Sequence, residues 1–315
     1  MENKNLDFSV IVCCYNSDIE KLKKTIISIA KQKDVSFEII ISDDGSKNNN
    51  REEIEKWVEL NKIQNIKYNF LEKNVGTLEN IISASEIADG RYLKTFSPGD
   101  YLYDENVLKT YLDMFLKKDY AILFSKAVYF TSEGKVICGY NPIASGTCKK
   151  LFLKNNFLKY ADSFLGATIA LKKEIIKYYK QLVGVVRLLE DYPVTYLSLL
   201  NNEKIGFINK NLVWYECDTG VSTANNGTRL ENEYYQFFEY LLQIYKDNKK
   251  IKKNVKVLKV LRKESKFKKL IKVSLLRPSF VLYFLDYQFT SLFRKIAFKL
   301  KKIDANKIKN ITNFK

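Results

Sequence analysis

Residues 8–15 read FSVIVCCY and residues 37–42 read FEIIIS, so the chain begins with two uninterrupted β-prone apolar runs. Such runs are typical of parallel strands that are buried on both faces of a sheet. Two similar runs follow, at residues 66–71 (IKYNFL) and 92–96 (YLKTF). The segments between the runs repeat apolar residues at helical spacing: 19–30, 52–60 and 77–88. The order βαβαβαβ predicts a parallel sheet with helices on both of its faces.

The pattern changes after Asp100, where strands and helices no longer alternate regularly. A helix, a long β-prone run and a hairpin-like segment are expected at residues 104–117, 121–130 and 132–140. Residues 163–215 then contain two strands with two helices between them. We place boundaries near residues 115 and 235, which divide the chain into two α/β halves and a C-terminal tail.

The composition narrows the class of protein. With 315 residues and 46% hydrophobic side chains, the chain can bury a sizeable core. No stretch approaches 18 uncharged apolar residues, and the N-terminus lacks a basic patch followed by an apolar run. We therefore expect a cytoplasmic protein that does not span a membrane. The absence of histidine excludes Ser-His-Asp and Cys-His catalytic systems, so carboxylates are the expected general bases and metal ligands.

The net charge of +17 is concentrated in the tail. Residues 245–315 hold 22 Lys and Arg against 4 Asp and Glu, whereas residues 1–244 hold 31 against 32. Such asymmetry indicates a polyanionic partner. Residues 246–302 join lysines to an aromatic and aliphatic face, a pattern typical of a helix in a membrane interface, so an anionic membrane surface is the expected partner. Nucleic acid is a less favoured partner for the tail. The alternative without a partner is that the tail packs against the body of the protein through its apolar face.

Three polar clusters follow strands of the predicted sheet, where ligands of an open parallel sheet bind. They are Tyr15-Asn16, Asp43-Asp44-Gly45-Ser46 and Ser97-Pro98-Gly99-Asp100. A carboxylate there can accept hydrogen bonds from a nucleobase or a ribose, and a single Asp near a diphosphate is adequate for Mg²⁺ or Mn²⁺. The alternative for the two acidic clusters is a turn built from residues that favour turns.

A fourth cluster, LLEDYP at residues 188–193, places two adjacent acids before Pro193. Proline is common in the first turn of a helix, where negative charge is also favourable, so Asp191 suits a helix start. A positioned carboxylate can instead serve as a general base for an attacking hydroxyl. On spacing alone, the structural role is favoured.

Together these segments resemble the glycosyltransferase family 2 enzymes. SVIVCCYN is similar to their opening strand, EIIISDDGS to their nucleotide-contacting strand and turn, and NVGTLENIISASEIADGRYL to the segment before their metal site. LLEDYPVTYLSLL is similar to their ED motif with its helix, and VWYECDTGVST to a late segment. The resemblance runs from about residue 6 to 225 in the family's order. It implies the GT-A fold, an α/β fold whose Rossmann-like, mainly parallel mixed sheet is flanked by helices, here followed by a basic α-helical tail.

The resemblance also implies an activity, the transfer of a sugar from a nucleotide-diphosphate sugar, with UDP the favoured nucleotide, to an acceptor hydroxyl with inversion. The regions then become a nucleotide-sugar-binding half (1–115), an acceptor-binding and catalytic half (116–235) and a basic amphipathic tail (236–315). A saccharide or lipid-linked acceptor is implied, in bacterial cell-surface polysaccharide or glycolipid synthesis. The expected location is the inner face of the cell membrane.

Individual roles follow from the same resemblance. The residues expected to bind the nucleotide are Cys13, Tyr15, Asp43, Asp44, Asn74 and Ser97. Asp100 would hold Mn²⁺ or Mg²⁺ on the diphosphate. Asp191 would be the general base, with Glu190 supporting sugar hydroxyls.

The sequence departs from the family's pattern at three places. Ser97-Pro98-Gly99-Asp100 replaces the usual D-x-D, Leu78-Glu79-Asn80 replaces a common ARN, and Cys217 stands where a histidine is frequent. The first departure bears on metal dependence. It also motivates a second hypothesis, a catalytically degenerate GT-A-like protein that its tail recruits to membrane or nucleic acid. A nucleotidyltransferase is less favoured because CCYNSD has no glycine-rich phosphate loop.

Overall fold

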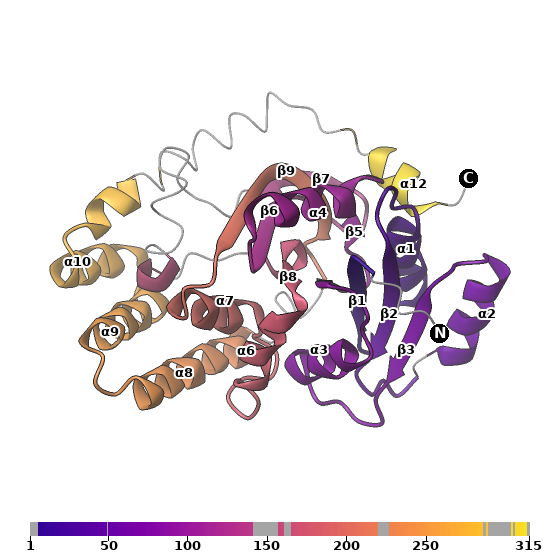
Figure 1. Ribbon diagram of the computed structural model, residues 1–315. Helices are drawn as coiled ribbons and strands as arrows, with labels where there is room; N and C mark the ends of the chain where they lie inside the picture. The colour runs from indigo at the N-terminus through magenta and orange to yellow at the C-terminus, as the bar shows by residue number, and fades with distance from the viewer. Residues whose placement is uncertain are drawn as a thin grey trace.

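One mixed sheet forms the centre of the molecule (Figure 1). The computed structural model describes residues 6–48, 50–140, 157–160, 165–219, 227–285, 288, 304 and 306–313. Within them, nine strands join in the order β3-β2-β1-β4-β8-β6-β9-β5, and β7 pairs with β6. The strands are β1 (Phe8–Cys14), β2 (Phe37–Asp43), β3 (Ile66–Phe70), β4 (Tyr92–Phe96), β5 (Tyr101–Leu102), β6 (Ile122–Phe130), β7 (Val136–Tyr140), β8 (Ala170–Lys172) and β9 (Ile205–Glu216).

The first four strands are parallel, as their apolar runs predict, and the second half of the sheet is mixed. β1 lies between β2 and β4, and β2 continues the sheet to β3. β8 runs antiparallel to both β4 and β6, whereas β6 and β9 are parallel. The two-residue strand β5, which was not expected from the sequence, pairs with the end of β9. This pairing brings the segment after β4 to the end of β9.

Helices cover both faces of the sheet. They are α1 (Ile19–Ala30), α2 (Arg51–Leu60), α3 (Thr77–Glu86), α4 (Val107–Lys118), α6 (Ile176–Lys180), α7 (Asp191–Leu200), α8 (Gly227–Ile244), α9 (Lys249–Lys263), α10 (Lys266–Leu276) and α12 (Asn306–Thr312), with 3₁₀ turns η1 (Gly166–Thr168) and η2 (Lys173–Ile175). Asp18 begins α1 by accepting hydrogen bonds from the backbone N–H groups of Glu20 and Lys21. The alternation of strands and helices in the first hundred residues is therefore confirmed.

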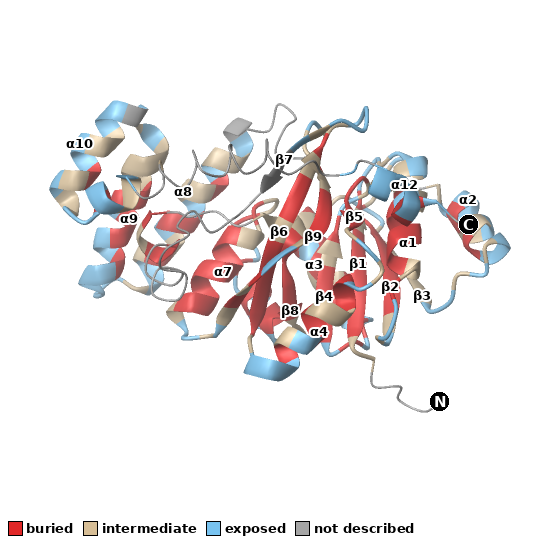
Figure 2. Cartoon of the chain, turned by 90° about the horizontal axis from the view of Figure 1, so that it is seen from above, coloured by how far each residue is buried: buried red, intermediate tan, exposed pale blue. Residues whose placement is uncertain are grey.

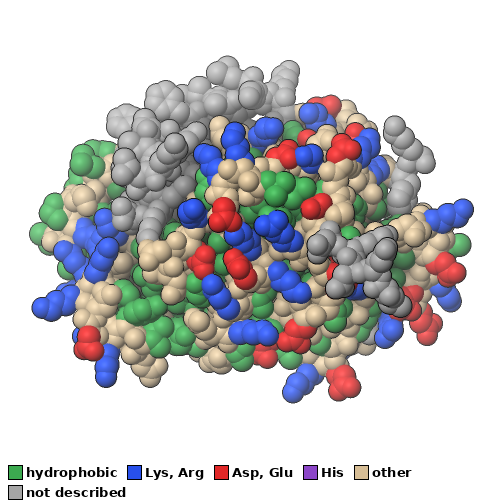
Figure 3. All heavy atoms as spheres, viewed as in Figure 1, with side chains coloured by type: hydrophobic (Ala, Val, Ile, Leu, Met, Phe, Trp, Pro, Cys, Tyr) green, Lys and Arg blue, Asp and Glu red, His purple; other side chains and the backbone are tan. Residues whose placement is uncertain are grey.

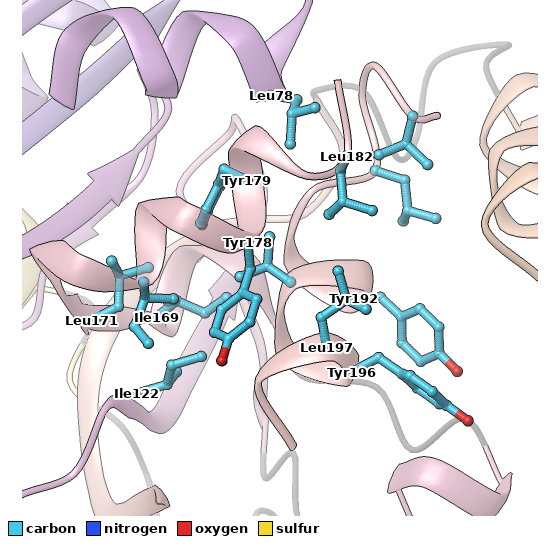
Figure 4. Packing of buried hydrophobic residues seen from close by; sticks show 14 of the residues in the cluster. Leu78, Ile122, Ile169, Leu171, Tyr178, Tyr179, Leu182, Tyr192, Tyr196 and Leu197 are labelled. Carbon is cyan, nitrogen blue, oxygen red and sulfur yellow. The ribbon is translucent and has the colours of Figure 1, made fainter. Parts of the chain in front are cut away.

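The core consists of two large apolar clusters, one on each face of the sheet. Val10 and Val12 of β1 pack with α1 and α4, whereas Ile11 packs with α3, α6 and α7. Because successive side chains of a strand point to opposite faces, a strand buried on both needs an uninterrupted apolar sequence. Figure 2 shows the resulting buried centre, with exposed residues on the outer helices. Figure 4 shows part of the second cluster, where Tyr178 and Tyr179 of α6 lie near α7.

The first two helices of the tail belong to the same apolar cluster as α7. Phe237 and Leu241 of α8 and Val255 of α9 are fully or almost fully buried in it, and the boundary expected near residue 235 falls inside α8. Farther on, Ile311 of α12 packs beside Trp214 of β9. Residues 220–223 of the late motif lie outside the described residues, as do residues 286, 287 and 289–302 of the expected membrane segment. Among those described, no helix has the length and apolarity that crossing a membrane requires.

Candidate active site

The carboxyl ends of β1, β2 and β4 meet at one edge of the sheet, since the three strands are neighbours and parallel. The expected site residues therefore gather there, as the topology predicts. Tyr15 and Ser97 are exposed at this edge, with 52% of Tyr15 accessible. Asp43, Asp44 and Asp100 are instead buried.

The Asp44 carboxylate holds the loop at residues 74–76. It accepts hydrogen bonds from Val75 N at 2.7 Å, Gly76 N at 2.9 Å and Asn74 Nδ2 at 2.9 Å. Burial raises the pKa of Asp44, and the two backbone donors oppose that rise. Asp44 thus joins Asn74, another expected nucleotide ligand, and shapes this wall of the site.

Asp43 shapes the turn that follows β2. Its two oxygens accept hydrogen bonds from Ser46 N at 2.8 Å and Ser46 Oγ at 2.6 Å. Gly45 has a φ of +66°, and a Cβ on it would lie 2.3 Å from the carbonyl carbon of Lys73. Only glycine fits this close approach of two loops. Asp43 and Ser46 thus stabilise the chain after β2, and contact of this cluster with a nucleotide stays a prediction.

Arg187 connects the loop at residues 74–76 to the segment before Glu190. Its Nε donates to Val75 O at 3.0 Å, and its Nη2 donates to Asn74 O at 2.7 Å and to Asn74 Oδ1. Glu233 of α8 holds the same segment from the other side, because one oxygen accepts from the backbone N–H of Arg187 at 3.0 Å and of Leu188 and Leu189 at 2.8 Å each. Sequence reasoning missed both residues, which lie outside the recognisable motifs.

Glu190 and Asp191 stand at the start of α7, partly exposed at the same edge. Asp191 Oδ1 accepts from Tyr192 N at 2.7 Å, and Oδ2 would lie 3.1 Å from a Cβ placed on Gly166. Burial raises the pKa of both acids, and the negative charge of Asp191 adds to the rise at Glu190. Arg262, which α9 contributes, opposes the rise at Asp191.

Cys13 lies near the end of β1, and the charges of Glu190 and Asp44 both act on its thiol. Burial, followed by the charges of Glu190 and Asp44, raises the pKa of the Cys13 thiol far above its ordinary value. Cys13 is therefore a neutral, non-nucleophilic wall residue. Asp44 and Arg187 both hydrogen-bond the loop at residues 74–76, so the segment before Glu190 lies beside the end of β2.

Asp100 lies in the turn between β4 and β5. Thr25 of α1 anchors this turn by accepting from Gly99 N at 3.1 Å and donating to Asp100 O at 3.0 Å. Asp100 Oδ1 accepts from Glu216 N at 3.2 Å. Burial raises the pKa of Asp100 to about 8, although Glu216 N and Lys94 oppose the rise. Asp100 therefore shapes the turn, whatever else it binds.

Glu216 is the second carboxylate beside Asp100, and sequence reasoning missed it. Its Oε2 contacts Lys21 Nζ at 2.7 Å and accepts from Thr219 Oγ1 at 2.7 Å. The part of the chain that the structure describes contains no cluster of three or more His, Cys, Asp or Glu that could hold a metal. Mg²⁺ and Mn²⁺ commonly use only one or two carboxylates with substrate phosphates, so the two residues fit such an ion.

Lys94 is a buried lysine between the two parts of the site. Its Nζ donates to Ala167 O at 2.6 Å, in the turn against which Asp191 packs. Burial lowers the pKa of Lys94 to about 7, while Asp100 opposes the change. Sequence reasoning did not identify Lys94 as a site residue. The feature that could have indicated it is a lysine inside the apolar run YLKTF.

Residues 9–178 match the model of a protein family described as glycosyl transferase family 2. The chain belongs to this family. The GT-A type of fold is also confirmed, by three crystal structures of S. aureus TarS. TarS 1–349 in complex with UDP-GlcNAc has a TM-score of 0.56 at 19% identity, covering 75% of this chain and 67% of that one. A longer TarS structure has a TM-score of 0.56 at 19% identity, and the match covers 83% of this chain and 44% of that one. The UDP complex of TarS 1–349 has a TM-score of 0.54 at 18% identity, with coverage of 75% of this chain and 66% of that one. A sequence search of curated proteins finds no match.

Family membership shows that this chain is a glycosyltransferase, as its motifs led us to expect. The matched residues include the three clusters at the ends of β1, β2 and β4 but stop before Glu190. The roles of Glu190 and Asp191 therefore rest on their position at the edge of the sheet. The roles of all individual site residues remain predictions.

Proposed function

We propose that this glycosyltransferase moves a sugar from a UDP-sugar to an acceptor hydroxyl with inversion, using Asp191 as general base. The observation that carries the proposal is that Arg187, three residues before Glu190, hydrogen-bonds the loop at residues 74–76 that Asp44 also holds, which brings the start of α7 to the Asp44 side of the sheet edge. The UDP-GlcNAc and UDP complexes of S. aureus TarS support UDP as the nucleotide. Tyr15 and Ser97, both exposed, are the side chains available to a nucleotide there.

The chemistry follows from the position of Asp191. An ionised carboxylate removes the acceptor's proton as the hydroxyl attacks the anomeric carbon from the face opposite the diphosphate, which inverts that carbon. Burial raises the pKa of Asp191 and makes it a stronger base than an exposed Asp. Glu190, beside it, is placed to accept hydrogen bonds from sugar hydroxyls.

A divalent cation is proposed for the diphosphate. Asp100, with Glu216 next to it, would hold Mn²⁺ or Mg²⁺, and the bound ion would neutralise charge on the leaving group. Lys21 already contacts Glu216, so an ammonium group stands at the same place. If a divalent cation neutralises the diphosphate, activity should depend on metal. If the Lys21 ammonium group does so, activity should persist without metal.

We place the reaction at the inner face of a bacterial membrane, with a saccharide or lipid-linked acceptor in cell-surface polysaccharide or glycolipid synthesis. The basic tail supports this location, because its charge suits an anionic surface. The hydrophobic side chains that it exposes suit the lipid.

The experiment is a panel of UDP-, GDP- and dTDP-sugars, each incubated with Mn²⁺, Mg²⁺ or EDTA while nucleotide release is measured. Release of UDP only, and only with a metal, is the expected result. Release of UDP in EDTA would support the transferase activity without a metal, and Asp100 would then have only its role in the turn. Release of GDP or dTDP alone would contradict the UDP assignment.

A catalytically degenerate binding protein is the second candidate. One observation favours it, because the carboxylates of Asp43 and Asp44 already have hydrogen-bond partners within the chain. Binding of UDP without turnover, in the presence of both metals and an extract that contains acceptor glycans and lipids, would favour this candidate. Turnover of any donor would exclude it.

A further inference from the structure

Exposed hydrophobic side chains gather in one short stretch of the tail. Of the 13 large hydrophobic residues that are exposed in the described parts of the chain, 6 lie between residues 267 and 285. They are Phe267, Ile271, Leu275, Val281, Leu282 and Leu285. Exposed hydrophobic residues are normally scattered singly, so this concentration indicates an interaction surface.

Three of these residues form a stripe along α10. Phe267, Ile271 and Leu275 are spaced four apart, which places them on one face of a helix. The opposite face of α10 is packed, since Val273 is fully buried with Val257 of α9. The helix thus has one face that anchors it to α9 and, among the described residues, an apolar face that is exposed.

The residues after α10 extend the apolar surface and are held in place from beneath. The ring of Phe280 lies 5.3 Å from that of Tyr160, and Tyr160 Oη is 2.9 Å from Ser279 Oγ. With Phe280 anchored inward, Leu282 and Leu285 remain on the outside, at exposures of 72% and 47%. The exposed side chains are therefore fixed outward by neighbours that are packed.

Positive charge surrounds this apolar surface. Residues 246–285 hold 14 Lys and Arg against 2 Asp and Glu. Lys268 and Lys272, four residues apart, follow Phe267 and Ile271 along the same helix and are exposed. Figure 3 shows hydrophobic side chains at the left edge of the molecule, over α10, with lysine and arginine side chains beside them.

We propose that α10 and residues 277–285 form a docking face for an anionic lipid bilayer. The apolar stripe would enter the interface between headgroups and acyl chains, and the lysines would contact the headgroups. A second copy of the chain fits less well, because two surfaces with this excess of positive charge repel each other. Nucleic acid fits less well too, since the stripe is mostly aliphatic and only one exposed aromatic ring, Phe267, is available in it for stacking.

The test is sedimentation of the full chain with vesicles of phosphatidylcholine alone or of phosphatidylcholine and phosphatidylglycerol at about 3:1, because anionic headgroups attract basic segments. The variant is Phe267→Ser, Leu275→Ser and Leu282→Ser together, at positions exposed by 73%, 80% and 72%. The matched control is Leu60→Ser with Leu116→Ser, at leucines exposed by 81% and 62% on α2 and α4. All these side chains are at the surface, so the fold should survive, which circular dichroism checks.

We expect the wild type and the control to bind the anionic vesicles equally, and the triple variant to bind at least about tenfold more weakly. Lys268→Glu with Lys272→Glu should also weaken binding, and neutral vesicles should bind poorly. Equal binding by the triple variant would overturn the proposal. A dimer that only the triple variant loses, without vesicle binding, would assign the face to a second copy. The experiment measures binding to vesicles, so its outcome does not depend on whether the protein transfers a sugar.

Discussion

Burial, backbone hydrogen bonds and the charge of Arg262 together set the pKa of Asp191. Burial raises its pKa above the ordinary value of an aspartate, and Arg262 partly offsets the rise. As a base, Asp191 works only when ionised, so activity should appear as the pH rises through this raised pKa. We therefore expect log kcat/KM to fall on the acid side at a higher pH than an exposed aspartate would cause.

Arg262→Gln tests this account of the Asp191 pKa. Removal of the nearby positive charge raises the pKa further, so the acid limb of the profile should move to higher pH. Arg262→Lys keeps the charge and is the matched control, with a limb close to that of the wild type. An acid limb that Arg262→Gln leaves in place would show that Asp191 does not control it.

At the scale of elements, one carboxylate of α8 holds the segment that leads to Glu190 and Asp191. Glu233 is buried and accepts three backbone N–H groups from residues 187–189. Glu233→Gln should reduce the free energy of unfolding by about 1–3 kcal/mol, because a neutral amide oxygen is a weaker acceptor for the three N–H groups than a carboxylate oxygen. It should also lower kcat more than donor affinity.

The control on the same helix is Glu239→Gln. Glu239 is largely exposed and pairs with Lys259, so its loss should cost less than about 1 kcal/mol. Urea denaturation of both variants and their kinetic constants give the comparison. Equal stability and equal kcat for the two variants would refute the positioning role of Glu233.

Replacing a glycine can cost stability through strain of a left-handed backbone and through a clash of the new Cβ. Gly45 and Gly134 allow these two effects to be measured separately. Both have positive φ, +66° and +81°, but only at Gly45 would a Cβ meet backbone, 2.3 Å from Lys73. Gly134→Ala should cost about 1 kcal/mol for the left-handed backbone alone. Gly45→Ala should cost clearly more and weaken UDP binding, as thermal unfolding and calorimetry would measure. Similar losses at the two positions would mean that the loops can separate freely.

The sequence predicted the elements around the site better than the site's contacts. Periodicity located the first four strands and the start of α7, since each needs only local spacing of apolar residues and a proline. Glu216 and Arg187 were missed because their partners, Asp100 and Asn74, are more than 100 residues away in the sequence. The strand β5 was missed because two residues carry no periodic signal. Such long-range pairs depend on the topology, which residue spacing alone does not reveal.

At the scale of the whole molecule, the tail and the catalytic half share one apolar cluster. Phe237 of α8 is fully buried beside Tyr192 and Tyr196 of α7, with ring centroids 6.1 and 5.6 Å away. Phe237→Ala should therefore destabilise the protein by about 3–5 kcal/mol in one cooperative transition that also removes activity. Ile244→Ala, at an exposed position of α8, is the control, and calorimetry is the measurement. Activity that outlasts unfolding of α8 would contradict this coupling.

The central claim is that the edge of the sheet unites a nucleotide site with a carboxylate base. The most direct measurement compares Asp191→Asn with the wild type for both sugar transfer and UDP binding. The account predicts that transfer falls by about 10²–10⁴-fold, the usual contribution of a general base, while the Kd for UDP changes little. Transfer near the wild-type rate would contradict it, because Asp191 would then not be the base.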